Sequence, residues 1–509
     1  MSFNWKSLQN GSDIRGVALT GIANQPVNLT SDVVAHLAKA FSVWLEKKKK
    51  KATGLKIAVG MDSRLSGPDL KKAFSEALIN KGIDVYDCGL ASTPAMFMVT
   101  VTEPFMVDGA VMLTASHLPY NRNGLKFFTS EGGLEKQDIT EILNIAENGD
   151  FDEQSDSKEG ELSEVDFIST YSNILADKIR TEVNDADNYQ KPLSGSKIVL
   201  DAGNGAGGFY AHKVLEALGA NIEGSQFLDP DGRFPNHIPN PEDERAMASI
   251  CAAVKNNSAD LGIIFDTDVD RAAIVDAEGN PINRNELIAL SAAIVNEEHP
   301  NSTMVTDSIT SDGLAWFINE HIGAKHHRFK RGYKNVINES IRLNEQGEES
   351  WLAIETSGHA ALKENYFLDD GAYLVTKILI KMAKLKKEGK SLSSLIESLP
   401  RPKESKEFRL LIEQAEFAAY GERVISELGM YAASQANWEL VANNYEGVRV
   451  SCKGANEQGW FLLRLSLHDP VIPLNIESDL EGGVSKIAEK LLEFFNNFEY
   501  LNLKALQNN

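Results

Sequence analysis

A serine, a histidine and a lysine occur in one short stretch that could carry out group transfer. Two residues separate the apolar run Gly109–Leu113 from Ser116 and His117, and Lys126 lies ten positions after the serine. The apolar run predicts a buried strand, and the following residues are rich in proline, asparagine and glycine, which favour turns. A serine hydroxyl needs a neighbouring base or a strong electrophile to act as a nucleophile. The stretch therefore predicts either a nucleophilic serine on a loop or a serine that satisfies backbone groups in a turn.

Three aspartates alternate with other residues directly after a second apolar run. Asp266, Asp268 and Asp270 follow the predicted strand Leu261–Phe265, and Arg271 comes next. If the segment is extended, its period of two turns all three carboxylates to one side, where they could bind a divalent cation such as Mg²⁺ together with a phosphate. The arginine could help to neutralise that phosphate. The alternative is a solvated acidic turn, although three adjacent like charges are costly without a counter-ion.

A third polar stretch also begins where an apolar segment ends. Glu355, Ser357 and His359 follow Trp351–Ile354. A carboxylate, a hydroxyl and an imidazole on one loop suit hydrogen bonding to the neighbouring hydroxyl groups of a sugar. A plain turn is the alternative.

The last polar stretch contains Arg464, Ser466 and His468, between the apolar segments Trp460–Leu463 and Val471–Ile472. These side chains could form a cradle for an anion. An ordinary strand, turn and strand would give the same pattern.

One glycine pattern favours a different function. Gly203, Gly205 and Gly208 have the G-x-G-x-x-G spacing after a predicted strand, and Asp229 follows about twenty residues later. This is the fingerprint of dinucleotide binding, so an NAD-dependent oxidoreductase is the alternative from another enzyme class. The other polar stretches favour phosphate, metal and hydroxyl groups over a nicotinamide.

The elements that must position these residues repeat along the chain. A strand, a polar loop, a helix and a glycine occur in three copies, which begin at Leu55–Gly60, Ser196–Ala202 and Thr303–Thr306. Further strands are predicted at Ile83–Tyr86 and Ala220–Ile222. This order predicts three similar α/β domains with mixed, largely parallel sheets.

Beyond Pro400–Pro402 the composition favours helices followed by late strands, which predicts a C-terminal α+β domain. Near the N-terminus we predict a helix from Ser31, as its N-cap, to about Glu46, and we place Asp13–Gly16 on a loop. The predicted domains are 1–190, 191–298, 299–402 and 403–509.

Charge and cysteine content limit the classes of partner. The chain has 509 residues and a net charge of −22, which argues against general binding to nucleic acid or anionic membranes. The basic run Lys47–Lys51 is interpreted as a solvated helix end or loop. Cys88, Cys251 and Cys452 form no metal-binding or disulfide pattern and fit a reducing compartment. Neither a signal peptide nor a membrane-spanning run is recognised, so a cytoplasmic location is expected.

Taken together, the polar stretches resemble the motifs of the α-D-phosphohexomutase superfamily, in the same order along nearly the whole chain. That superfamily has a TASHNP serine loop, a DGDGDR metal loop, a GEMSGH-like sugar loop and an RxSGTEP-like phosphate loop, and also DIRG and GxK motifs. The matching segments are Thr114–Pro119, Asp266–Arg271, Ile354–His359, Arg464–Pro470, Asp13–Gly16 and Gly124–Lys126. The resemblance implies four domains around a central cleft.

The resemblance also implies a role for each matching residue. Ser116 would be phosphorylated, and its phosphate would join three carboxylates in binding one Mg²⁺ ion per chain; the metal ligands would be Ser116, Asp266, Asp268 and Asp270. The groups that would stabilise the transferring phosphoryl group or assist proton transfer are Arg15, His117, Lys126 and Arg271. The groups that would bind the sugar and its resting phosphate are Glu355, Ser357, His359, Arg464, Ser466 and His468.

The implied activity is the interconversion of hexose 1-phosphate and hexose 6-phosphate, with glucose or mannose as the sugar and a hexose 1,6-bisphosphate as intermediate and activator. An amino-sugar phosphomutase is one alternative. A divergent member that binds a sugar phosphate or a partner without turnover is another. Whether the chain is a monomer or an oligomer is left open by the sequence.

The chain departs from the family motifs at several positions. Leu118 replaces the asparagine of TASHNP, and Thr267 and Val269 replace two glycines of the metal loop, where a less permissive backbone is expected. In the phosphate loop, Leu467, His468 and Asp469 replace glycine, threonine and glutamate. The predicted grip on the substrate phosphate therefore differs more from the family pattern than the phosphoryl chemistry does.

Overall fold

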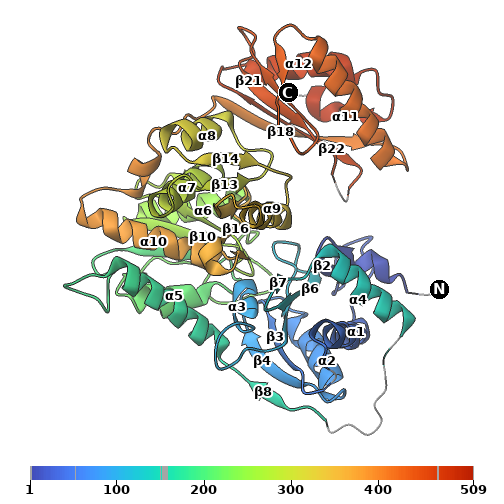
Figure 1. Cartoon of the computed structure of the whole chain (residues 1–509), viewed down its shortest axis with the longest axis vertical. Coiled ribbons are helices and arrows are strands. Elements are labelled where there is room, and N and C mark those ends of the chain that lie inside the picture. The colour runs from blue at the N-terminus through green and yellow to red at the C-terminus, as the bar shows by residue number, and fades with distance from the viewer. Residues whose placement is uncertain (1–2, 52, 150, 152–158, 467–468, 508–509) are drawn as a thin grey trace. The chain divides into compact units, whose positions relative to one another are not determined.

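The computed structural model describes residues 3–51, 53–149, 151, 159–466 and 469–507. Its chain divides into two compact units (Figure 1). The first comprises Met1–Asn283 and Ser357–Leu392, and the second comprises Arg284–Thr356 and Ser393–Asn509. Within the described residues, no helix is both long and apolar enough to cross a membrane.

The first unit begins with an α/β layer built on a mixed sheet. Its strands lie in the order β1-β2-β6-β5-β3-β4-β8, and β7 pairs with β6. The pairs β5–β3, β3–β4 and β4–β8 are parallel, as predicted. The pairs β1–β2, β2–β6 and β6–β5 are antiparallel. The strands are β1 (Gln9–Asn10), β2 (Asp13–Val17), β3 (Lys56–Met61), β4 (Asp84–Leu90), β5 (Gly109–Leu113), β6 (Arg122–Thr129), β7 (Gly132–Gly133) and β8 (Leu162–Glu164).

Helices α1, α2 and α4 share one apolar core with this sheet. Helix α3 contacts β3, β5 and β6, and α5 contacts β4 and α10. The helices are α1 (Ser31–Lys49), α2 (Gly67–Ile79), α3 (Thr93–Met98), α4 (Lys136–Asn148) and α5 (Phe167–Val183), with a 3-10 helix at Trp5–Leu8.

Two predictions near the N-terminus were wrong. Asp13–Gly16 lies in strand β2 and not on a loop, because β6, more than a hundred residues later, pairs with it. The N-cap of α1 is Thr30 and not Ser31: the Thr30 side chain accepts a hydrogen bond from the Val33 amide at 3.3 Å.

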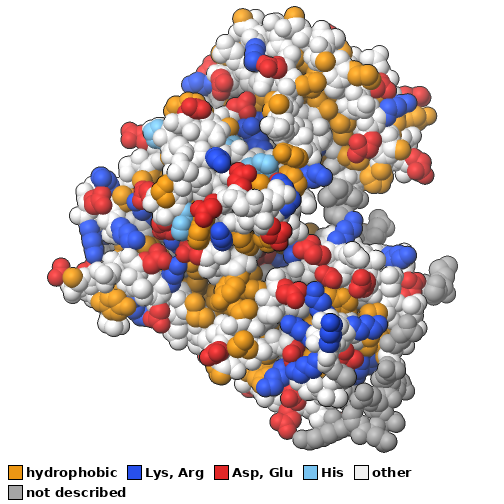
Figure 2. Space-filling model, in the orientation of Figure 1, with side chains coloured by type: hydrophobic (Ala, Val, Ile, Leu, Met, Phe, Trp, Pro, Cys, Tyr) orange, Lys and Arg blue, Asp and Glu red, His pale blue; other side chains and the backbone are white. Residues whose placement is uncertain are grey.

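The basic run at the end of α1 is a solvated helix end, as interpreted from the sequence. The last turn carries Lys47, Lys48 and Lys49, and Lys50 ends the helix in the left-handed conformation. Lysine and arginine side chains gather over this part of the first unit in Figure 2. Positive charge at a helix C-terminus complements the helix dipole.

A second, smaller sheet in the first unit has the order β12-β11-β10-β9, in which only β9 and β10 are parallel. Helix α6 packs its apolar face on it. The predicted strand Ala220–Ile222 is not formed, and Asn221 makes a single bridge to Lys197. The elements are β9 (Ile198–Asp201), a π-helix (Tyr210–Glu216), α6 (Glu244–Asn257), β10 (Leu261–Phe265), β11 (Ala272–Val275), β12 (Pro281–Ile282), β16 (Ala360–Leu362), a 3-10 helix (Lys363–Asn365), β17 (Leu368–Asp369) and α10 (Gly371–Lys387).

The second unit contains a parallel arrangement of β14, β13 and β15, which α7 and α9 contact. These elements are α7 (Asn285–Glu298), β13 (Thr303–Thr306), α8 (Asp312–Trp316), a π-helix (Phe317–His321), β14 (Lys325–Arg328), α9 (Tyr333–Glu345) and β15 (Ser350–Ile354).

The C-terminal part of the second unit is richer in strands than expected, because an antiparallel sheet of six strands opens with a long strand at Glu404. Helices α11 and α12 share its core. The elements are a 3-10 helix (Leu392–Ile396), β18 (Glu404–Ile412), α11 (Phe417–Ser434), β19 (Trp438–Leu440), β20 (Val448–Cys452), β21 (Gly459–Leu463), β22 (Val471–Ser478), α12 (Gly483–Phe495), β23 (Leu501–Asn502) and α13 (Lys504–Gln507).

The corrected helix cap leads to a first prediction. Thr30→Ala should destabilise the first turn of α1 by about 1 kcal/mol, because an N–H at the helix start loses its acceptor. Amide hydrogen exchange should accelerate in that turn. Ser31→Ala, one position away, is the matched control and should leave exchange unchanged. Equal acceleration in both variants would contradict the assignment of the cap.

Candidate active site

The hydroxyl group of Ser116 is surrounded by three of the predicted site residues. Ser116 follows β5 with a left-handed backbone (φ +49°) and is only 3 % exposed. Its Oγ donates to Oδ2 of Asp266 at 3.0 Å and accepts from Nη2 of Arg271 at 3.0 Å. Nδ1 of His117 lies 3.3 Å from the same Oγ. The serine is therefore not satisfied by a local turn alone, since its hydroxyl bonds to residues 150 and 155 positions away.

His117 is held in its neutral form. Burial and the positive charges of Arg271 and Arg15 lower the pKa of His117 to about 2. Nη2 of Arg271 lies 2.5 Å from Nδ1 of His117, so a neutral ring accepts this hydrogen bond through Nδ1. Proton transfer by this imidazole would therefore have to use the other ring nitrogen, Nε2.

The three aspartates converge, but by a different geometry from the one predicted. The segment after β10 is a turn and not an extended strand, and Val269 has a left-handed φ of +68°. Oxygen atoms of Asp266, Asp268 and Asp270 nevertheless lie within 4.8 Å of one another, and all three residues are buried. Oδ1 of Asp268 and Oδ1 of Asp270 have no hydrogen-bond partner. Buried carboxylate oxygens with unused lone pairs fit a hard divalent cation.

Lys126 connects the serine segment to the aspartates. It lies in β6, opposite Met112 of β5. Its Nζ donates to Oδ2 of Asp268 at 3.0 Å and also bonds to Oδ2 of Asp270. The strand pairing thus fixes the lysine beside two of the three carboxylates.

The aspartates differ in their affinity for protons. Burial, together with the negative charges of Asp270 and Asp268, raises the pKa of Asp266 well above its usual range. Burial also acts to raise the pKa of Asp270, but the positive charges of Lys126, His359 and Arg271 outweigh it and hold that pKa below the usual range. Cations from separate segments therefore stabilise the ionised form of Asp270.

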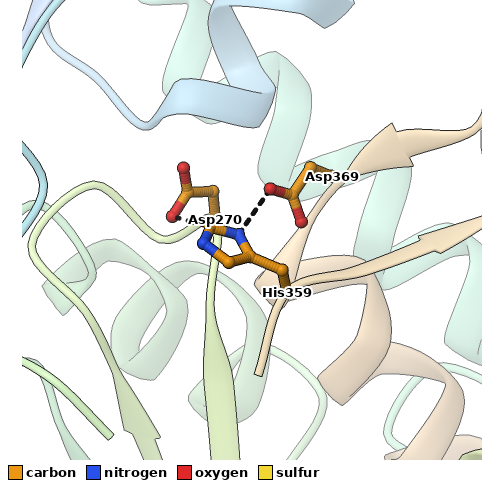
Figure 3. Close-up of side chains that lie close together, drawn as sticks. All are labelled: Asp270, His359 and Asp369. Carbon is orange, nitrogen blue, oxygen red and sulfur yellow. Dashed lines mark hydrogen bonds and ion pairs between the residues drawn. The ribbon is translucent and has the colours of Figure 1, made fainter. Parts of the chain in front are cut away.

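His359 lies beside this cluster (Figure 3). Its Nδ1 is 2.5 Å from Oδ2 of Asp369 and 3.9 Å from Oδ1 of Asp270. Burial alone would lower the pKa of His359, but Asp369 and Asp270 raise it to about 9. The imidazole predicted to contact sugar is thus a cation next to a predicted metal ligand. Sequence reasoning missed Asp369, which no motif marked.

Arg15 also reaches the serine segment. It pairs in β2 with Gly124 of β6, and its Nη1 donates to the carbonyl of Ala115 at 3.3 Å. Its Nη2 forms an ion pair with Asp13 at 3.1 Å. A second guanidinium is therefore placed directly beside the predicted nucleophile.

The glycine-rich loop is explained by close packing of backbone. A Cβ on Gly205 would lie 2.6 Å from the carbonyl oxygen of Thr267, and one on Gly208 would lie 2.2 Å from that of Leu228. The amide of Ala206 donates to the same Thr267 carbonyl at 2.8 Å. The glycines therefore let this loop support the metal-binding turn.

The boundary between the units falls between Thr356 and Ser357, so the predicted sugar-binding motif is described in two parts. Ser357 is buried and, like the partly buried His359, belongs to the first unit. In the second unit, Oε1 of Glu355 accepts from the Gly332 amide at 2.5 Å.

Arg464 lies just after β21 in the second unit. Burial lowers the pKa of its guanidinium, and the positive charge of Arg331 lowers it further. Its Nε has no hydrogen-bond partner. The negative charges of Glu446, Glu407 and Asp307 act on this pKa in the opposite direction. Arg331, in the basic pair after β14, was not singled out from the sequence.

The predicted phosphate loop is described only in part. Oγ of Ser466 accepts from the Asp469 amide at 3.3 Å, and the Ser466 amide donates to Val471 at 3.0 Å. Leu467 and His468 lie outside the described residues.

Comparison with known proteins gives consistent matches. Models of phosphoglucomutase/phosphomannomutase α/β/α domains I, II and III match residues 6–153, 175–279 and 283–402. The chain is 29 % identical over 476 residues to a phosphoglucomutase of Neisseria meningitidis, covering 93 % of this chain and 94 % of that protein. It is 30 % identical over 477 residues to a phosphoglucomutase/phosphomannomutase of Thermococcus kodakarensis, covering 93 % and 96 %. A solved structure of a phosphoglucomutase/phosphomannomutase family protein from Burkholderia thailandensis has a TM-score of 0.78 at 26 % identity and 97 % coverage of both chains.

The acidic cluster leads to a second prediction. Asp268→Asn and Asp270→Asn should each weaken Mg²⁺ binding at least about tenfold, because each removes one negative charge and one oxygen donor. Isothermal titration calorimetry would measure the affinity. Asp276→Asn is the matched control, because the Asp276 side chain lies in the turn after β11, where it accepts from the Asn280 amide at 2.8 Å. Unchanged affinity in both cluster variants would rule out this metal site.

Proposed function

The chain belongs to the phosphoglucomutase/phosphomannomutase family of α-D-phosphohexomutases, and from this we propose that it interconverts hexose 1-phosphate and hexose 6-phosphate through a phosphorylated Ser116. It is thus a phosphohexomutase, an isomerase. The observation that carries the serine mechanism is the position of Ser116 Oγ, 3.0 Å from both a carboxylate and a guanidinium.

The reaction consists of two phosphoryl transfers. A hydroxyl oxygen of the sugar monophosphate attacks the phosphorus of phosphoserine 116, so a new P–O bond forms while the bond to Oγ breaks. The proton of the sugar hydroxyl ends on Oγ of Ser116, so the products are a sugar bisphosphate and free serine. Ser116 then accepts the other phosphoryl group of the bisphosphate, which regenerates the phosphoenzyme. The enzyme ends the cycle with the one phosphoryl group with which it began, and the sugar phosphate is released as its isomer.

Residues of the first unit supply the charge that these transfers need. Arg271 Nη2 already donates to Oγ of Ser116, the atom on which negative charge develops as the P–O bond breaks. Lys126, Arg15 and the cationic His359 are proposed to stabilise the oxygens of the moving group. Because these donors are fixed before the substrate arrives, little reorganisation is required during transfer.

The acidic turn would hold the metal ion. Asp266, Asp268 and Asp270 would bind Mg²⁺ together with an oxygen of the Ser116 phosphate, as their buried, partly unused oxygens allow. When bound, the ion would withdraw electron density from the phosphoryl oxygens and neutralise part of their charge.

The second unit would grip the phosphate that is not reacting. Arg464 and Ser466 are proposed for this role, and the charge of Arg331 beside Arg464 favours the same anion. His468 remains a predicted contact.

Glu355 and Ser357 are proposed to hydrogen-bond sugar hydroxyls. Glutamate is a good acceptor for hydroxyl donors, and serine can both donate and accept.

Several finer points are also proposals. Glucose and mannose phosphates are the proposed substrates, with an amino-sugar phosphate as the alternative, and a hexose 1,6-bisphosphate is the proposed activator. The four-domain division at residues 190, 298 and 402 and the cytoplasmic location remain predictions. Gly205 and Gly208 of the Gly203–Gly208 loop are required by close protein backbone, which gives them a structural reason that needs no NAD.

A third prediction tests the nucleophile. Ser116→Ala should abolish Mg²⁺-dependent mutase activity on glucose and mannose 1-phosphates, because no residue remains to carry the phosphoryl group. Intact-protein mass should show one phosphoryl group on the native chain and none on the variant. Ser130→Ala, which changes a serine at the exposed turn after β6, is the control and should keep both properties. Turnover by the Ser116 variant would exclude the phosphoserine mechanism.

A fourth prediction concerns the phosphate grip. Arg464→Lys and Arg331→Lys should raise KM for the sugar phosphate about tenfold or more, because lysine cannot bind a phosphate through two parallel hydrogen bonds. The fraction of chains phosphorylated at Ser116 should stay unchanged. Arg423→Lys, at an exposed arginine in α11, should have no effect on KM. An unaltered KM in both test variants would remove these arginines from the substrate site.

A further inference from the structure

One arginine that none of the proposed chemistry uses is bonded to the backbone of the serine loop. Arg64 lies in the turn between β3 and α2 and is 1 % exposed. Its Nη1 donates to the carbonyls of Pro119 at 2.8 Å and Arg122 at 2.9 Å. Its Nη2 donates to the carbonyl of Leu118 at 2.7 Å and to that of Ser116 itself. The two terminal nitrogens of one guanidinium thus donate four hydrogen bonds to carbonyls within the seven residues 116–122.

Asp62 contacts both Arg64 and Thr114, which lies at the start of the serine loop. Its Oδ2 forms an ion pair with Nε of Arg64 at 3.2 Å, and its Oδ1 accepts from the Arg64 amide at 2.9 Å. The same Oδ2 accepts from Oγ1 of Thr114 at 2.6 Å, and that Oγ1 accepts from the Ser116 amide at 2.9 Å. A continuous chain of hydrogen bonds therefore runs from Arg64 through Asp62 to the amide of Ser116, while Arg64 holds the Ser116 carbonyl directly.

The turn that carries Arg64 is itself fixed by close packing. The Phe234 ring lies 5.3 Å from the guanidinium carbon. A Cβ on Gly232 would come within 2.4 Å of the Ser63 carbonyl and 2.7 Å of Arg64 Cα, so only glycine fits there. The Phe234 ring thus lies over the guanidinium, and Gly232 packs against the backbone of the turn that carries it. A donor set fixed by packing can impose its geometry on a loop.

From these contacts we infer that Arg64 is a positioning residue for the phosphoryl transfer. By binding the carbonyl of Ser116 and those of Leu118, Pro119 and Arg122 after it, Arg64 holds the nucleophile in its left-handed conformation and keeps Oγ facing Asp266 and Arg271. The inference rests on the proposed function, because it assigns Arg64 to the same nucleophile. Arg64 itself touches no reacting atom.

Only arginine has the donors for this task. A guanidinium offers five N–H groups in a rigid plane, whereas the lysine ammonium has three donors on a flexible stem. In Arg64→Lys the loop would lose at least one carbonyl partner and its fixed register. A displacement of about 1 Å at a reacting atom can lower a rate on the order of a hundredfold.

The test compares Arg64→Lys with Arg449→Lys. Arg449 is an equally buried arginine that binds the carbonyls of Ser308 and Thr310 in the second unit, so its variant controls for the general cost of losing such an arginine. We expect Arg64→Lys to lower kcat per folded molecule on the order of a hundredfold. The transfer rate from glucose 1,6-bisphosphate to dephosphorylated Ser116 should fall equally, while the Kd for glucose 1-phosphate stays unchanged. Arg449→Lys should match the native protein in all three values.

Chemical rescue gives a second readout that a purely structural role would not move. Millimolar guanidinium chloride should restore part of the kcat of Arg64→Ala, whereas urea at the same concentration should not. The inference is overturned if Arg64→Lys matches Arg449→Lys in kcat per folded molecule, or if a folded Arg64→Ala variant is not rescued. If Arg64→Ala does not fold, the lysine comparison decides. No turnover by the native protein would instead overturn the proposed function, and this inference with it.

Discussion

Burying three carboxylates side by side is the constraint on which the rest of the first unit depends. Asp266, Asp268 and Asp270 are all at most 1 % exposed, where both desolvation and mutual repulsion oppose ionisation. Such a cluster is tolerated only if cations surround it closely. The chain supplies them from distant segments: Lys126 from β6, Arg271 just before β11, and His359, which Asp369 keeps protonated.

The sheet architecture follows from this need. In a purely parallel sheet the chain would leave the serine loop for a helix, and the next strand would start at the opposite edge. Here β6 instead turns back antiparallel beside β5, so Lys126 lies close to the loop it has just left. Strand β2 then adds Arg15 opposite Gly124. The antiparallel extension is therefore the part of the fold that delivers positive charge to the nucleophile.

Local patterns predicted the strands well and the long-range contacts poorly. Strands β5, β10 and β13 have the predicted bounds. For β5 and β10 the reason is an apolar run that ends abruptly at polar residues. Asp13–Gly16 has no such pattern, and only its pairing with β6 makes it a strand. The turn at Val269 was equally hidden, since a β-branched residue rarely adopts a positive φ.

The same distinction holds for the site. Its motif residues could be named from their order along the chain, whereas Asp369 and Arg331 matter only through neighbours that no local pattern specifies. The state of His117 depends on Arg271, 154 residues away. Charge and protonation in a buried cluster are collective properties, and a linear pattern does not contain them.

Because Arg64 holds the serine loop by its carbonyl oxygens, the loop's shape is largely independent of its side chains. Every residue type offers the same backbone carbonyl, so the side chain at position 118 can change without loss of the hydrogen bond to Arg64. This explains how Leu118 can stand where related proteins of the superfamily have asparagine, with the nucleophile still in place. A catalytic loop anchored in this way separates the variable part of its sequence from the fixed part of its geometry.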